Sequence, residues 1–186
     1  MFLIAFQTSE KLKGITFILL FVIFFCEKNF SQNCSTLNIQ WQSDLPSTCN
    51  QMVMTMIHDV LGRPFLYVAN KEAGLKIYNI TDLTSPMLVQ TIPTNLFDTL
   101  DVMSLSQSGN YIYLALGNSF TNPQQAGTAI VDVTTPSSAS VADYFVVPGF
   151  SSGGGIVKAE GNYAYLGAMQ SGLVIFDVTD KNNITS

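Results

Sequence analysis

The chain has 186 residues, a formal net charge of −5 at pH 7, and 11% charged against 47% hydrophobic residues. This length predicts a single domain with one ordinary core. Because DNA and RNA binding depends on contacts between basic side chains and phosphates, the negative charge argues against a nucleic-acid partner.

The first segment, residues 1–32, has the pattern of a secretory signal. Lys11 and Lys13 precede an apolar run over residues 15–26, and a polar stretch follows. Twelve residues at about 1.5 Å rise span about 18 Å, short of the ~30 Å hydrocarbon core of a bilayer. We therefore predict a signal peptide, contact with a membrane only during export, and a secreted or cell-surface protein. An uncleaved signal anchor is the alternative.

Residues 33–51 form a polar segment that contains two cysteines. Cleavage of the signal leaves Cys34 and Cys49 in an oxidising compartment, where an even number of cysteines favours a disulfide. Two unpaired thiols are the alternative. Apolar and polar residues alternate over residues 37–41, which predicts a short edge strand.

Residues 52–186 repeat one pattern three times: a tyrosine-rich strand, a loop, a glycine-led apolar strand that ends in Asp or Asn, and a threonine-bearing turn. The paired strands are residues 65–69 with 74–79, 111–115 with 127–132, and 163–167 with 172–177. Tyr67, Tyr113 and Tyr165 occupy equivalent positions, 46 and 52 residues apart. This spacing is close to the ~40–50 residues of a four-stranded propeller blade.

The flanking sequence supplies the other strands of each blade. Residues 101–116 and 155–167 each fold back around a Gly-Asn pair, which is typical of a tight β-hairpin. A fourth strand is predicted at residues 87–92 and 141–147, whereas the third copy stops where its fourth strand should begin. We therefore predict an all-β, partial β-propeller of two and a half to three four-stranded antiparallel blades, over residues 52–92, 101–147 and 155–186.

These repeats resemble the LVIVD-repeat β-propeller proteins. Residues 173–177 read Leu-Val-Ile-Phe-Asp, which differs from the family signature at one position, and the two earlier copies are looser. The resemblance covers residues 52–186 and implies exported, often surface-associated proteins built of radially arranged blades, generally without an assigned reaction. Propellers typically have four to eight blades. We therefore expect that further blades, or self-association, complete the array.

Three equivalent side chains are candidate structural residues. Asn79, Asp132 and Asp177 end the signature strand of each copy, just before a threonine. Asx side chains accept hydrogen bonds from backbone amides two residues further on, so we interpret them as turn caps. Binding of calcium or another hard cation is the alternative. The paired tyrosines of the second and third copies (Tyr111, Tyr113, Tyr163 and Tyr165) are interpreted as packing between blades, with sugar stacking as the alternative.

Few residues are candidates for catalysis. His58 is the only histidine. Asp98 and Asp101 precede the first strand of the second blade, where propeller loops can face the central channel; we interpret them as part of a solvated loop, with cation binding or acid–base chemistry as the alternative. Residues 151–155 lack the lysine of a phosphate-binding loop, so they are interpreted as a flexible linker. We therefore predict no cofactor and no metal, and a non-enzymatic surface scaffold that binds protein or glycan. A propeller hydrolase or lyase, and a purely structural stalk, are the alternatives.

Overall fold

The computed structural model describes residues 52–120 and 122–186. The predicted signal peptide (1–32) and the segment 33–51, with Cys34 and Cys49, lie outside these residues. Within the described residues, the regular structure is β-strand apart from short 3-10 turns, and no helix is long and apolar enough to cross a membrane.

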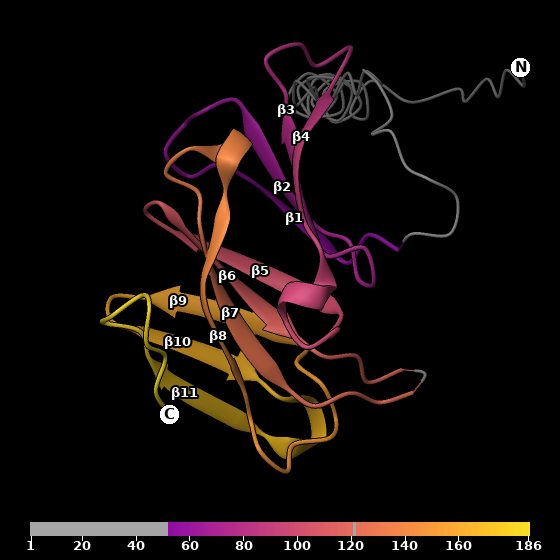
Figure 1. The fold of residues 1–186 in the computed structure, drawn as a ribbon, viewed down its shortest axis with the longest axis vertical. Helices are drawn as coiled ribbons and strands as arrows, with labels where there is room; N and C mark the ends of the chain where they lie inside the picture. The colour runs from indigo at the N-terminus through magenta and orange to yellow at the C-terminus, as the bar shows by residue number, and fades with distance from the viewer. Residues whose placement is uncertain (1–51, 121) are drawn as a thin grey trace, which may run out of the picture. The chain divides into compact units, whose positions relative to one another are not determined.

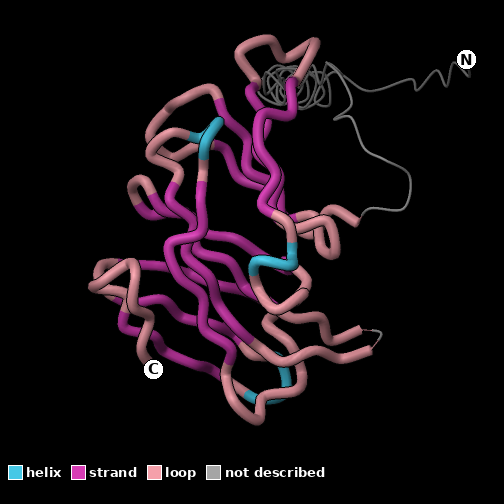
Figure 2. The backbone as a smooth tube through the Cα atoms, viewed as in Figure 1, coloured by secondary structure: helices cyan, strands magenta, loops and turns pink. Residues whose placement is uncertain are grey.

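The strands form three antiparallel sheets, which we call blades 1, 2 and 3 (Figure 1). Blade 1 consists of β1 (Thr55–His58), β2 (Phe65–Ala69), β3 (Leu75–Asn79) and β4 (Met87–Ile92). Blade 2 consists of β5 (Val102–Ser108), β6 (Tyr111–Leu116), β7 (Gly127–Asp132) and β8 (Ser140–Val146). Blade 3 consists of β9 (Ile156–Glu160), β10 (Tyr163–Gly167) and β11 (Leu173–Asp177). Neighbouring strands pair in chain order, so each blade is a meander (Figure 2).

The three blades share one register. Tyr67 lies opposite Ile77 in blade 1, and the equivalent pairs are Tyr113 with Ile130 and Tyr165 with Ile175. Because side chains alternate between the two faces of a strand, each pair defines one face of its blade. Aromatic and β-branched cross-strand pairs also stabilise a sheet. The repeated pattern of the sequence is therefore a repeated pairing in the fold.

Two hydrophobic cores join the blades. Tyr67 and Ile77 from blade 1 belong to one cluster with Ile112 and Leu114 from blade 2, and all four are fully buried. The opposite face of blade 2 packs on blade 3 in a second cluster, whose buried members include Tyr113, Ile130, Ala164, Leu166 and Phe176. Blade 2 is thus covered on both faces, which explains why its middle strands are almost entirely buried.

The outer face of blade 3 differs from the equivalent faces of blades 1 and 2. Tyr67 and Tyr113 are 0% and 1% exposed, as expected for packing between blades. In blade 3, however, Tyr165 is only half-buried and Ile175 is 51% exposed. Among the described residues, no further sheet covers this face. The same side chains therefore act as core where a neighbouring blade is present and as surface where none is described.

The described residues confirm the predicted all-β, partial-propeller fold class, with sheets of four, four and three strands. In blade 3 only Thr185 stands in the place of a fourth strand, as an isolated bridge to Asp177. The equivalent pairs in the other blades are Asn79 with Met87 and Asp132 with Ser140. The ladder of the fourth strand thus begins at the same position in all three blades.

Candidate functional site

The two ends of the blades carry different connections. The end with the tight turns of β1–β2, β5–β6 and β9–β10 is called the hairpin end, and the opposite end is called the loop end. At the loop end, Lys71 pairs with Val102, and the Gly154 amide donates to the Leu116 carbonyl at 2.9 Å. Connections of neighbouring blades therefore contact each other there. The segments at the loop end are residues 70–74, 93–101, 117–126, 147–155 and 168–172.

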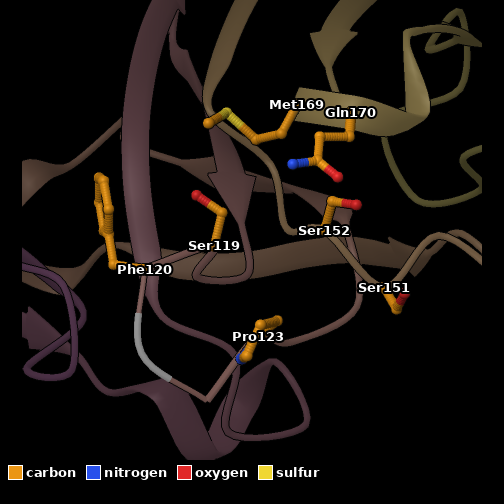
Figure 3. A pocket seen from close by; sticks show the side chains of 7 residues that line it. All are labelled: Ser119, Phe120, Pro123, Ser151, Ser152, Met169 and Gln170. Carbon is orange, nitrogen blue, oxygen red and sulfur yellow. The ribbon is translucent and has the colours of Figure 1, made fainter.

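A pocket of about 500 Å³ lies at the loop end of blades 2 and 3 (Figure 3). Three separate connections form it: the one between β6 and β7, the one between β8 and β9, and the one between β10 and β11. Pockets built from several loops on a rigid scaffold are common binding sites. The lining residues are Ser119, Phe120, Pro123, Ser151, Ser152, Met169 and Gln170.

The pocket is lined by uncharged side chains with both apolar and hydrogen-bonding groups. Phe120 is 64% exposed and Met169 is 49% exposed. Ser171, next to the lining, donates from its hydroxyl to the Ser152 hydroxyl at 3.4 Å. An exposed aromatic ring beside hydroxyl and amide groups suits a neutral ligand with one apolar face and several polar atoms.

The glycine run beside this pocket is not a flexible linker, so that interpretation of residues 151–155 is wrong. The Gly154 amide donates to both Leu116 and Gly117 carbonyl oxygens. A Cβ on Gly153 would lie 2.5 Å from the Gly117 carbonyl oxygen, and one on Gly154 would lie 2.7 Å from that of Leu116. These glycines are required because two backbones approach closely, which brings the β8–β9 connection against blade 2.

The predicted carboxylate pair at the loop end is divided between two environments. Asp101 is 7% exposed, and the Lys71 Nζ lies 3.9 Å from its Oδ2. Burial raises the pKa of Asp101, an effect that the Lys71 ammonium opposes. Asp98 is exposed and accepts a hydrogen bond from the Tyr144 hydroxyl at 3.1 Å. The two carboxylates thus have different partners: Asp101 has Lys71 from blade 1, and Asp98 has Tyr144 from β8.

His58 lies at the other end of its sheet. It is the last residue of β1 and pairs with Leu66 at the start of β2, which is the hairpin end. Asp101 directly precedes β5, and Lys71 beside it is at the loop end. The enzymatic alternative requires His58, Asp98 and Asp101 in one site. The structure does not bring His58 to the two carboxylates.

The three residues proposed as turn caps have one geometry. The Asn79 Oδ1 accepts from the Thr81 amide at 2.8 Å, and Asp132 and Asp177 accept from the amides of Thr134 and Thr179 at 2.7 and 2.8 Å. Hydrogen bonds donated by Thr179 lower the pKa of Asp177. Each bond closes an Asx turn after the signature strand. In the described part of the chain, no group of three or more His, Cys, Asp or Glu residues is arranged to hold a metal.

A buried charged network at the hairpin end was not found by sequence reasoning. The Asp59 Oδ2 accepts from Arg63 Nε and Nη2 at 2.9 and 2.6 Å and from the Tyr67 hydroxyl at 2.6 Å. The Arg63 Nη1 donates onward to the carbonyl of Val133 on blade 2, at 2.9 Å. One sequence feature could have indicated this network. The turn between β1 and β2 is longer than the equivalent β5–β6 and β9–β10 turns of blades 2 and 3.

Comparison with known proteins agrees with the repeat pattern. A family model described as the LVIVD repeat matches residues 60–94, 101–144 and 155–185, together more than half of the chain. The chain belongs to the LVIVD-repeat family. Each matched segment overlaps one blade, although the first begins after β1, so one LVIVD repeat corresponds to most of one propeller-like sheet. The search of curated proteins found no match.

Two solved structures are similar to this LVIVD-repeat chain. One is the computationally designed Ika8 protein, with a TM-score of 0.47 and 11% identity over 69% of this chain and 34% of that chain. The other is a chain of the Mitotic Checkpoint Complex, with a TM-score of 0.45 and 15% identity over 80% of this chain and 45% of that chain. The present chain thus spans less than half the length of either.

Proposed function

We propose that this LVIVD-repeat chain is an exported, non-enzymatic scaffold at the cell surface that binds protein or glycan through the loop end of its blades. The observation that carries the proposal is the uncharged pocket between the loop-end connections of blades 2 and 3, with Phe120 exposed beside it. The blades hold the connections in place through two cores, so the pocket is formed before a ligand arrives.

The residue types at the pocket favour binding over chemistry. Among the described residues, its lining includes three serines but no His, Lys, Asp, Glu or Cys side chain that could transfer a proton or activate a serine hydroxyl as a nucleophile. The remaining enzymatic alternative depends on Asp101, which is buried beside Lys71, and on His58 at the opposite end of its sheet. A hydrolase or lyase site would need these groups within hydrogen-bond reach of one substrate. The structural-stalk alternative predicts instead that no ligand occupies the loop end.

The binding proposal predicts that Phe120→Ala weakens ligand binding at least tenfold, because the variant loses the exposed ring on which a ligand can stack. The probes are an array of neutral and acidic oligosaccharides and a displayed library of random peptides, screened with the purified chain and followed by calorimetry on the strongest binder. Leu83→Ala is the matched control, since Leu83 is 54% exposed and follows β3 at the hairpin end. Failure of both libraries, or a binder that is insensitive to Phe120→Ala, would support the stalk instead.

The export part of the proposal makes a separate prediction. We expect that the chain expressed with its own N-terminus in a secreting host is recovered from the medium or the cell surface. Mass spectrometry should place the new N-terminus between residues 31 and 33, after the apolar run of the signal. A protein that remains in the cytosol with residue 1 intact would contradict export, whatever the loop end binds.

A further inference from the structure

The turn after β11 contains a tripeptide that is an acceptor pattern in exported proteins. Asn183, Ile184 and Thr185 read Asn-x-Thr, in which x is any residue except proline. This pattern marks an asparagine that can receive an N-linked oligosaccharide, and such asparagines lie in surface loops of secreted proteins. Because the pattern is short, the geometry of the turn decides whether Asn183 can carry a glycan.

This turn has the same closing hydrogen bond in all three blades. Counted back from the residue that pairs with the end of the signature strand, the equivalents of Asn183 are Ser85 and Ser138. The amides of Ser85, Ser138 and Asn183 each donate to the carbonyl three residues earlier, at 3.2, 2.9 and 3.2 Å. All three residues are exposed. In blades 1 and 2 the turn leads into β4 and β8, so this position is exposed whether or not a fourth strand follows it.

Contacts of the residues beside Asn183 hold it at the surface. Ile184 is 4% exposed and belongs to the core between blades 2 and 3, and its amide donates to the Asp143 Oδ2 on β8 at 2.7 Å. Thr185 exchanges two backbone hydrogen bonds with Asp177 and is itself exposed. Within residues 52–120 and 122–186, no hydrogen bond engages the Asn183 side chain. Its Nδ2 can therefore be substituted without loss of a contact.

A second Asn-x-Thr pattern in the described residues lies in a different environment. Asn79 precedes Ile80 and Thr81, and its Oδ1 accepts from the Thr81 amide at 2.8 Å. Asn79 is half-buried and is paired on both sides, with Phe65 on β2 and Met87 on β4. The equivalent residues of the other blades are aspartates with the same bond. The turn cap therefore explains Asn79 without a glycan.

We propose that Asn183 is a site of N-linked glycosylation. The proposal rests on the export proposed above, through a secretory pathway that contains an oligosaccharyltransferase. In the reaction, a bond forms between the Asn183 Nδ2 and C1 of the oligosaccharide, and the bond from C1 to the oxygen of a polyprenyl diphosphate carrier breaks. The diphosphate leaves with the bonding electrons, and Nδ2 loses one proton.

The position of Asn183 separates the glycan from the loop-end pocket. Asp177, at the end of β11, lies opposite Tyr163, which directly follows the tight β9–β10 turn. The turn after β11 therefore belongs to the hairpin end, whereas the pocket lies at the other end of the same blade. A glycan at Asn183 covers part of the hairpin end and leaves the loop end open to a ligand.

The test uses the full chain secreted by a eukaryotic host, with sites mapped by mass spectrometry. Enzymatic removal of an N-linked glycan converts the glycosylated asparagine to aspartate, and in heavy-oxygen water this conversion labels the site. We expect most molecules to be labelled at Asn183 and none at Asn79. The patterns that begin at Asn29 and Asn33 lie outside the described residues, and peptide mapping reads them separately.

Three variants separate glycosylation from a structural effect. Thr185→Ala should abolish the label at Asn183, whereas Thr185→Ser should keep it, because the transferase requires a hydroxyl two residues after the asparagine. Both variants keep the backbone bonds of Thr185 to Asp177. Asn79→Asp is the matched control, since it removes the other pattern but keeps an acceptor for the Thr81 amide. It should leave the label at Asn183 unchanged.

Failure of this proposal is distinguishable from failure of export. A secreted chain with a cleaved N-terminus but no label at Asn183, or a label that persists in Thr185→Ala, would overturn the glycosylation site and leave export intact. If the chain's own N-terminus does not direct export, the full chain is expressed behind the host's signal peptide. A label at Asn183 would then support the site while contradicting native export, and its absence would overturn the site as well.

Discussion

Replacing Asp59 with alanine is expected to lower the free energy of unfolding by about 3–5 kcal/mol, the cost of breaking a buried ion pair from one side. The Asp59 side chain is fully buried and accepts three hydrogen bonds from Arg63 and Tyr67. Its removal leaves a partly buried guanidinium and a buried hydroxyl without their acceptor. Because Arg63 also reaches the Val133 carbonyl, the loss should loosen blade 1 from blade 2.

Urea unfolding of the wild type and the variant measures this difference. Glu160→Ala is the matched control, because Glu160 is an exposed carboxylate at the end of β9 with an ordinary strand conformation. We expect the control to change the midpoint little, as is usual for exposed polar groups. Equal effects of the two substitutions would show that the network adds nothing beyond an ordinary surface contact.

The same network predicts how stability depends on pH. Burial by itself would raise the pKa of Asp59, but hydrogen bonds from Arg63 and Tyr67 outweigh it and hold the pKa below the ordinary value of 3.8. The stabilisation from this carboxylate is therefore complete above pH 3.8 and is lost as the pH falls through the lower pKa of the folded state. The difference in stability between wild type and Asp59→Ala should shrink over that acid range and stay constant between pH 5 and 7.

Gly74→Ala is expected to destabilise the protein by about 2–5 kcal/mol, from backbone strain and steric overlap together. Gly74 has a φ of +83°, a conformation that an alanine adopts only with strain. Its Cβ would also lie 2.1 Å from the Ile92 carbonyl oxygen, which is backbone and cannot rotate away. We therefore expect β3 and β4 to separate locally, with loss of the ladder between them.

The control for this substitution is Gly62→Ala. Gly62 has a similar φ of +76°, but no atom lies within 4 Å of its Cβ position. Gly62→Ala should lower the free energy of unfolding only by the backbone strain of a positive φ, about 1 kcal/mol. The difference in stability between the two variants therefore measures the steric overlap of the Gly74→Ala methyl group with β4. Thermal unfolding with circular dichroism provides the measurement. If Gly74→Ala were no worse than Gly62→Ala, the close approach of the two strands would not contribute.

The blade architecture was predictable because its determinants are local in the sequence. Alternation of apolar and polar residues sets which side chains share a face, and the tight turns set the register. The turn geometry at Asn79, Asp132 and Asp177 is also local, since each acceptor bonds an amide two residues further on. Such features recur in each copy, so three weak patterns reinforce one another.

The candidate binding site was not predictable in the same way. Phe120, Ser152 and Met169 belong to three different connections, and nothing in their local sequence relates them. The glycines at 153 and 154 were misinterpreted because a flexible linker and a close approach of two backbones use the same residue. Only the position of blade 3 beside blade 2 distinguishes these two uses.

The sequence by itself determined the period, the strands, the faces and the turns of this LVIVD-repeat chain, because each depends on residues a few positions apart. The tertiary structure decided the contacts between blades: the link from Arg63 to Val133, the burial of Asp101 beside Lys71, and the different exposure of Ile130 and Ile175. These depend on which surfaces meet across tens of residues. Equivalent positions of similar repeats therefore have different roles according to what packs beside them.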